Sequence, residues 1–143
     1  MAEDPAFTNA KTVMTAIDAG KPYEEYKHLV AECATFSAQA HALEDIVTLE
    51  GWAAWMKNFV ENIGPDLKVE IKALSWDPER RMASMFAVYH ATHTGSGGPV
   101  PATGKVTHTD CVYVLKMNNE NKVEHFYKIW NDTHCMKELG WME

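Results

Sequence analysis

Residues 104–132 read GKVTHTDCVYVLKMNNENKVEHFYKIWND, and this stretch decides the fold. It contains two segments, 105–117 and 122–131, that are rich in β-branched and aromatic residues. Such a composition favours β-strands. The polar turn NNEN at 118–121 is short, and short turns join strands that run antiparallel. The stretch therefore predicts two long strands that lie side by side.

Two more strands are predicted upstream. Residues 81–94, RMASMFAVYHATHT, form one of them, and the turn formers of GSGGPVPATG at 95–104 connect it to the next strand. An earlier strand begins after Pro65, where apolar and polar residues alternate, as in a half-buried strand. Its apolar positions are Leu67, Val69, Ile71 and Ala73, and the turn DPER at 77–80 ends it. Four consecutive strands with short turns predict an antiparallel meander.

The N-terminal region predicts two helices. The first has one apolar stripe at helical spacings of three and four, formed by Phe7, Ala10, Met14 and Ile17. Gly20 ends this helix, and Pro22 is well placed as the first residue of the next one. The buried face of that second helix is expected to hold Tyr23, Tyr26, Leu29 and Val30.

A third helix is predicted over residues 49–63, after a short strand at 33–40. Its apolar residues recur with a period of 3.6 and are Trp52, Trp55, Met56, Phe59, Val60 and Ile63. Thr48 can cap this helix at its start, and Gly64 with Pro65 ends it. Helices segregated from four consecutive strands predict an α+β fold, formed by a single domain over residues 1–143.

Charge and composition exclude several classes of function. The net charge is −7 and no cluster of Lys or Arg offsets it, so nucleic acid is not an expected partner. No run of 18 apolar residues is present, and the acidic N-terminus does not resemble a signal peptide, so we expect a cytoplasmic protein without a membrane span. Cys33, Cys111 and Cys135 are widely spaced and form no CxxC motif, which indicates neither a disulfide framework nor a zinc ribbon.

The segments GKVTHTDCVYVL and KVEHFYKIWND, followed by a closing ELG, resemble the SnoaL-like polyketide cyclases of the nuclear-transport-factor-2-like (cystatin-like) superfamily. The resemblance covers nearly the whole chain. It implies a cone-shaped curved antiparallel sheet wrapped around three N-terminal helices. It also implies an apolar pocket at the open end of the cone. The implied substrate-binding residues are Trp55, Phe59, Trp130, Phe36 and His125, although core packing is the alternative role for each aromatic ring.

Asp132 is the first candidate for catalysis. The resemblance implies that this acid is a general acid/base in an intramolecular aldol cyclisation. A carboxylate in an apolar pocket has a raised pKa and is therefore a better base, and Ile129 and Trp130 flank it. In this chain Asn131 separates Trp130 from Asp132 where the family usually has Trp-Asp. The alternative is a solvated carboxylate at a strand end, or a cap for the C-terminal segment.

Histidines are the second group of candidates. His90 and His108 lie on strands that the meander places side by side, and we expect one of them within a hydrogen bond or one water of Asp132. The segments VYHATH and GKVTHTD also resemble scytalone dehydratase, which implies that His108 and His90 act together with an acid. The alternative for each is an ordinary strand histidine. No set of three or four convergent metal ligands is visible, so we predict no metal site.

The sequence therefore predicts a small SnoaL-like enzyme of the cyclase, isomerase or dehydratase type that uses no cofactor. It would perform acid/base chemistry on an apolar, polyketide-like carbonyl compound. The alternative is a non-catalytic small-molecule-binding or dimerisation module on the same fold. The two strands at 105–117 and 122–131 are apolar on both faces, while helices can cover only one. A homodimer that buries the second face is therefore expected.

Overall fold

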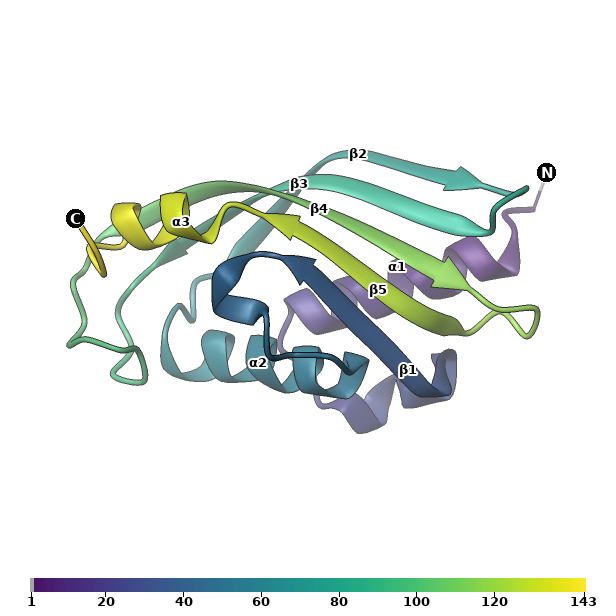
Figure 1. Cartoon of the computed structure of the whole chain (residues 1–143), viewed down its shortest axis with the longest axis horizontal. Helices are drawn as coiled ribbons and strands as arrows, with labels where there is room; N and C mark the ends of the chain where they lie inside the picture. The colour runs from purple at the N-terminus through teal and green to yellow at the C-terminus, as the bar shows by residue number, and fades with distance from the viewer. Residues whose placement is uncertain (1) are drawn as a thin grey trace.

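The computed structural model describes residues 2–143, which form one curved five-stranded sheet and three α-helices (Figure 1). The sheet has the strand order β1-β5-β4-β3-β2. The elements are α1 (Pro5–Asp18), β1 (Val30–Gln39), α2 (Leu49–Asn62), β2 (Lys68–Asp77), β3 (Met82–Thr92), β4 (Val106–Met117), β5 (Val123–Trp130) and α3 (Asp132–Glu138). The predicted α+β class with a curved sheet is confirmed.

Strands β2 to β5 form the predicted antiparallel meander. The short strand expected at 33–40 is β1, and it pairs in parallel with β5, with Phe36 opposite Phe126. Helix α2 and three strands separate these partners in the chain. A bulge between Ile71 and Ala73 shifts the register of β2, which is an edge strand and is largely exposed. The alternation expected for this strand is therefore interrupted.

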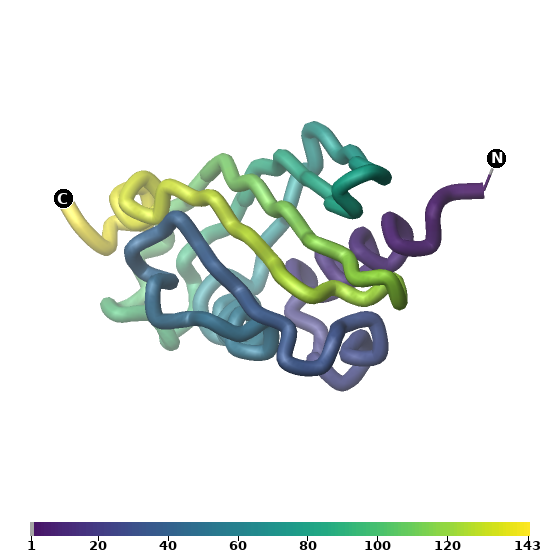
Figure 2. The backbone as a smooth tube through the Cα atoms, turned by 45° about the vertical axis from the view of Figure 1, so that its right-hand side comes forward, coloured from purple at the N-terminus to yellow at the C-terminus, as the bar shows by residue number. Residues whose placement is uncertain are grey.

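Two of the helices cover the inner face of the sheet, as Figures 1 and 2 show. Helix α1 begins at Pro5, where the Asp4 side chain accepts the Ala6 N–H, and its end is followed by Gly20 at a φ of 70°. Helix α2 begins after Thr48, whose hydroxyl accepts the Gly51 N–H at 3.0 Å. Its predicted apolar stripe is buried against the sheet, with Trp52, Met56 and Phe59 at its centre.

The prediction of a second helix after Pro22 is wrong. Residues after Pro22 form two 3₁₀ turns, Tyr23–Glu25 and Lys27–Leu29, because β1 already begins at Val30 and leaves no room for a longer helix. The third helix of the structure is α3, at the C-terminal end of the chain. The Asn131 side chain caps it by accepting the His134 N–H at 3.1 Å. Thus only α1 and α2 precede the meander, and the ELG segment ends a helix.

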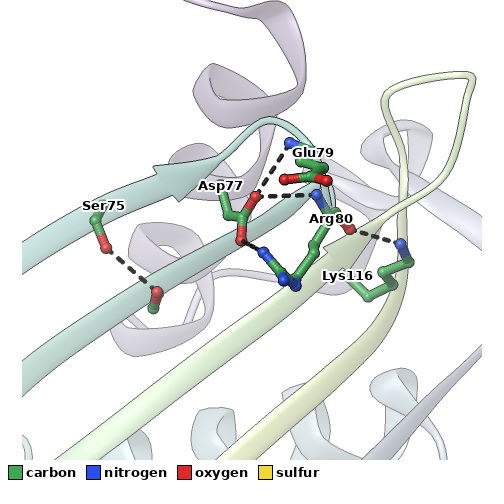
Figure 3. Close-up of polar contacts among 6 residues, drawn as sticks. Ser75, Asp77, Glu79, Arg80 and Lys116 are labelled. Atoms are coloured by element: carbon green, nitrogen blue, oxygen red, sulfur yellow. Dashed lines mark hydrogen bonds and ion pairs between the residues drawn. The ribbon is translucent and has the colours of Figure 1, made fainter.

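The carboxylate of Asp77 lies at the turn between β2 and β3, and its contacts are with residues of that turn (Figure 3). Asp77 Oδ1 accepts the backbone N–H groups of Glu79 and Arg80, each at 3.0 Å, and Oδ2 pairs with the Arg80 guanidinium. Lys116 on β4 donates to the Arg80 carbonyl at 2.7 Å. These contacts fix the turn that the DPER sequence predicts.

Strand parity divides the side chains of the sheet between two faces. Odd-numbered residues of β3 and β4, such as Tyr89 and Tyr113, point to the helices and are buried. In β5 the inner positions are Phe126, Lys128 and Trp130, all buried. A lysine therefore lies among the core aromatic residues, and it defines the candidate site.

Candidate functional site

Lys128 has its ammonium group inside the molecule, with 1% of its surface exposed. Nζ lies 4.2 Å from the ring centre of Trp52, 4.3 Å from that of Trp130 and 4.6 Å from that of Tyr89. Ring faces attract a cation, and the attraction is stronger where water is absent. Burial nevertheless lowers the pKa of Lys128 to about 8, against the opposing effect of Cys111 and Asp18.

Among residues 2–143, this ammonium makes one hydrogen bond, to Tyr89 on β3. Lys128 Nζ donates to Tyr89 Oη over 3.2 Å, and both groups are buried. A phenol that accepts a hydrogen bond from a cation becomes a stronger donor through its own O–H. The pair can therefore present a strengthened hydrogen-bond donor to a neighbouring acceptor.

A narrow apolar cavity lies next to this pair, between α2, the sheet and α3. Its walls are Trp55, Met56, Phe59, Leu67, Tyr89, Ala91, Thr107, Trp130 and Cys135. Its volume is about 20 Å³, which is room for one water. The Trp130 indole N–H is buried and has no partner among residues 2–143. An unpaired buried donor is costly to the stability of the fold.

Asp18 and Tyr113 form a second polar pair inside the fold. Tyr113, on β4, donates to Asp18 Oδ1 at the end of α1 over 2.7 Å. Burial raises the pKa of Asp18 to about 7, while the Tyr113 hydrogen bond and the Lys128 charge act to lower it. Leu67 lines both the cavity beside Tyr89 and the hollow in which Asp18 lies.

Asp132, the predicted catalytic acid, is 7% exposed at the first turn of α3. Its Oδ2 accepts the Ala42 N–H at 2.7 Å, and its Oδ1 accepts the Thr133 N–H at 3.1 Å. It lines an open hollow with Trp130, His41 and Glu44, separate from the apolar cavity. Among residues 2–143, no direct hydrogen bond joins Asp132 to a histidine, and a contact through one water stays a prediction.

His90 and His108 do lie side by side, as predicted, with their Nδ1 atoms 2.6 Å apart. Both occupy even-numbered positions of β3 and β4, on the outer face of the sheet and away from the cavity. His125 is also on the outer face of β5, between the hydroxyls of Thr35 and Ser37 at 2.6 and 2.8 Å. Because successive residues of a strand point to opposite faces, a shift of one residue would decide whether these histidines face outward or face the cavity.

The predicted aromatic walls divide into two groups. Trp55, Phe59 and Trp130 line the cavity. Phe36 does not line it; its ring stacks on Trp52, 4.9 Å between centres, inside the core. The sequence interpretation missed Lys128, Tyr89 and Asp18. The sequence does contain a signal for Lys128. Phe126, Lys128 and Trp130 alternate along one strand and share one face, so burying both rings also buries the lysine.

Within residues 2–143, no three His, Cys, Asp or Glu side chains converge as a metal site would require. The same residues contain no helix of the length and apolarity that crossing a membrane requires.

Solved structures show which fold this geometry belongs to. A candidate SnoaL-like polyketide cyclase from Shewanella putrefaciens superposes with a TM-score of 0.75 at 13% identity, covering 99% of this chain and 100% of that one. IdmH, a candidate polyketide cyclase from Streptomyces antibioticus, gives 0.74 at 14% identity over 96% and 99%. AclR, a candidate hydroxylase from Streptomyces galilaeus, gives 0.73 at 16% identity over 96% and 86%.

No protein-family model and no curated protein matches the sequence. The chain has the fold of SnoaL-like polyketide cyclases, as the resemblance of its sequence predicts. Neighbours with this fold include cyclase-type and hydroxylase-type proteins, so the fold does not by itself select a reaction.

Proposed function

We propose that the chain is a small acid/base enzyme of the SnoaL-like type that acts on an apolar carbonyl compound in the cavity. Tyr89, supported by Lys128, would donate a hydrogen bond to the carbonyl oxygen. The single observation that carries this proposal is the buried Lys128–Tyr89 pair beside an apolar cavity. The candidate cyclases among the structural neighbours agree with a carbonyl substrate.

The chemical reason is the charge that develops during enolisation. When a proton leaves the carbon beside a carbonyl, negative charge collects on the oxygen, and donors that are already in place stabilise it. Tyr89 has such a donor, held by the Lys128 ammonium in surroundings from which water is excluded.

Asp132 stays the predicted proton acceptor. Trp130 lines both the cavity and the hollow that contains Asp132, so a ligand that extends past this ring would approach both Tyr89 and the carboxylate. Because the cavity has room for only one water, entry of such a ligand requires the side chains of its wall to move. Leu67 and Trp55, each partly exposed, are the wall residues with most freedom to do so.

The test is hydrogen–deuterium exchange at the carbon beside the carbonyl of small aromatic ketones, followed by NMR in D₂O. This readout requires no knowledge of the natural substrate. We expect the protein to accelerate exchange, and Tyr89→Phe and Lys128→Met to reduce the acceleration by roughly ten- to a thousandfold. His108→Gln, on the outer face, is the matched control and should retain it. Equal exchange in all four proteins would refute the proposed role of the pair.

One observation favours the alternative of a non-catalytic binding module. The cavity is almost filled by its own side chains, as in a module that holds a small ligand or none. Such a module would bind aromatic ketones, detected by quenching of Trp55 and Trp130 fluorescence, without accelerating exchange. Binding of the ketone together with accelerated hydrogen–deuterium exchange would favour the enzyme.

A further inference from the structure

A second hollow opens between α1 and the β2 edge of the sheet. Its lining residues are Thr15, Asp18, Ala19, Leu67, Val69, Ile71 and Met85, and its volume is about 220 Å³. Apart from Asp18 and Thr15, every lining side chain is apolar. The hollow is thus an apolar pocket of small-molecule size with a single carboxyl group in its wall.

Asp18 has only part of its hydrogen-bonding capacity in use. Oδ1 accepts the Tyr113 hydroxyl, and this is the one hydrogen bond that Asp18 makes with residues 2–143 through its side chain. Asp18 is only partly buried and its side chain lines the hollow. One carboxylate oxygen is therefore available to a guest.

The negative charge of Asp18 is poorly compensated. Asp18 is the last residue of α1, where the helix dipole disfavours an anion. The surrounding side chains are apolar, and the nearest cation of the core, Lys128, makes its own hydrogen bond to Tyr89 instead. Its raised pKa agrees with this, because the proton supplies the compensation that the protein does not. A bound cation would supply it equally well.

We infer that this hollow binds a small organic ammonium ion, whose N–H groups pair with Asp18 Oδ2 while its apolar body packs on Val69, Ile71 and Met85. A hard metal ion does not fit, because such ions require several oxygen ligands and this wall offers one carboxylate and one hydroxyl. The net charge of −7 favours approach of a cation. This site is independent of the carbonyl chemistry proposed above.

Calorimetric titration of the full chain with benzylammonium tests the site, with neutral benzyl alcohol as the uncharged probe of the same shape. We expect the wild type to bind benzylammonium at least about tenfold more tightly than the alcohol, as a charge-assisted hydrogen bond would give. Asp18→Asn should remove this preference. Asp45→Asn, which removes an exposed carboxylate elsewhere, should keep it.

Methyl NMR of the wild type locates the ligand without any substitution. Benzylammonium should shift the methyl signals of Val69, Ile71 and Met85, and leave those of Ala38 beside the Asp132 hollow unchanged. Equal affinity for amine and alcohol, an unchanged preference in Asp18→Asn, or shifts confined to other methyl groups would each overturn the inference. Loss of ketone exchange in Lys128→Met is a separate result and does not bear on it.

Discussion

The buried ammonium group of Lys128 lowers the stability of the fold and also forms part of the candidate site. Burial of its ammonium among rings is unfavourable, as its lowered pKa indicates, and methionine has a similar shape without the charge. We expect Lys128→Met to raise the free energy of unfolding by on the order of 1–3 kcal/mol at pH 7. The gain should shrink as the pH rises from about 8 toward 10.5, where the unfolded lysine also loses its proton.

Urea unfolding of both proteins between pH 7 and pH 10 measures this difference. A variant less stable than the wild type at pH 7 would mean that the ring contacts and the Tyr89 hydrogen bond outweigh the burial of charge.

Asp18 contributes the opposite pH dependence. Its pKa is about 7 in the folded protein and 3.8 in its ordinary state, so the folded form binds the proton more tightly. Its stabilising contribution is complete below pH 3.8 and is lost as the pH rises to about 7. We expect Asp18→Asn to be more stable than the wild type at pH 8, by on the order of 1–3 kcal/mol, and similar to it near pH 4. Thermal melts at the two pH values measure this.

At the level of elements, Asp132 joins α3 to the segment between β1 and α2 through the Ala42 N–H. Asp132→Ala leaves that donor without its partner, and we expect a loss of about 1–3 kcal/mol in the free energy of unfolding. Asn131→Ala, which removes only the cap of α3, should lose about 1 kcal/mol. Denaturant unfolding compares the two variants.

Ketone exchange by an Asp132→Asn variant separates the structural role of this residue from the catalytic one. Lower stability with retained exchange assigns Asp132 to structure alone. Retained stability with lost exchange assigns it to the acid/base step.

Local sequence predicts most of the elements and less of the site. Period and turn residues are local, so the meander and α2 could be predicted from residues 49–63 and 67–131. The parallel partner of β1 could not, because that pairing joins segments about 90 residues apart. Likewise, adjacency of His90 and His108 follows from strand order. Their outward direction depends on the register that buries Tyr89 and Tyr113 instead.

At the level of the whole molecule, the outer face of the sheet exposes large apolar side chains. Phe86, Tyr127 and Ile129 are 40%, 41% and 53% exposed. We propose that a second copy of the chain covers this face, since helices cover only the inner one. Light scattering should show a dimer at micromolar concentration, and Ile129→Lys should convert it to a monomer. The Met142→Lys variant, which changes an apolar residue of the C-terminus that is 45% exposed, should remain a dimer. A monomeric wild type contradicts the proposal.

The most direct measurement is the ionisation of 2-naphthol bound in the cavity, because its hydroxyl becomes the kind of negative oxygen that Tyr89 and Lys128 would stabilise. Absorbance titration should give a pKa for the bound naphthol that is lower than in water by about one unit or more. With Lys128→Met the lowering should disappear while naphthol still binds. An unshifted or raised pKa on the wild-type protein, or the same lowering in the variant, would contradict an oxyanion site at this pair.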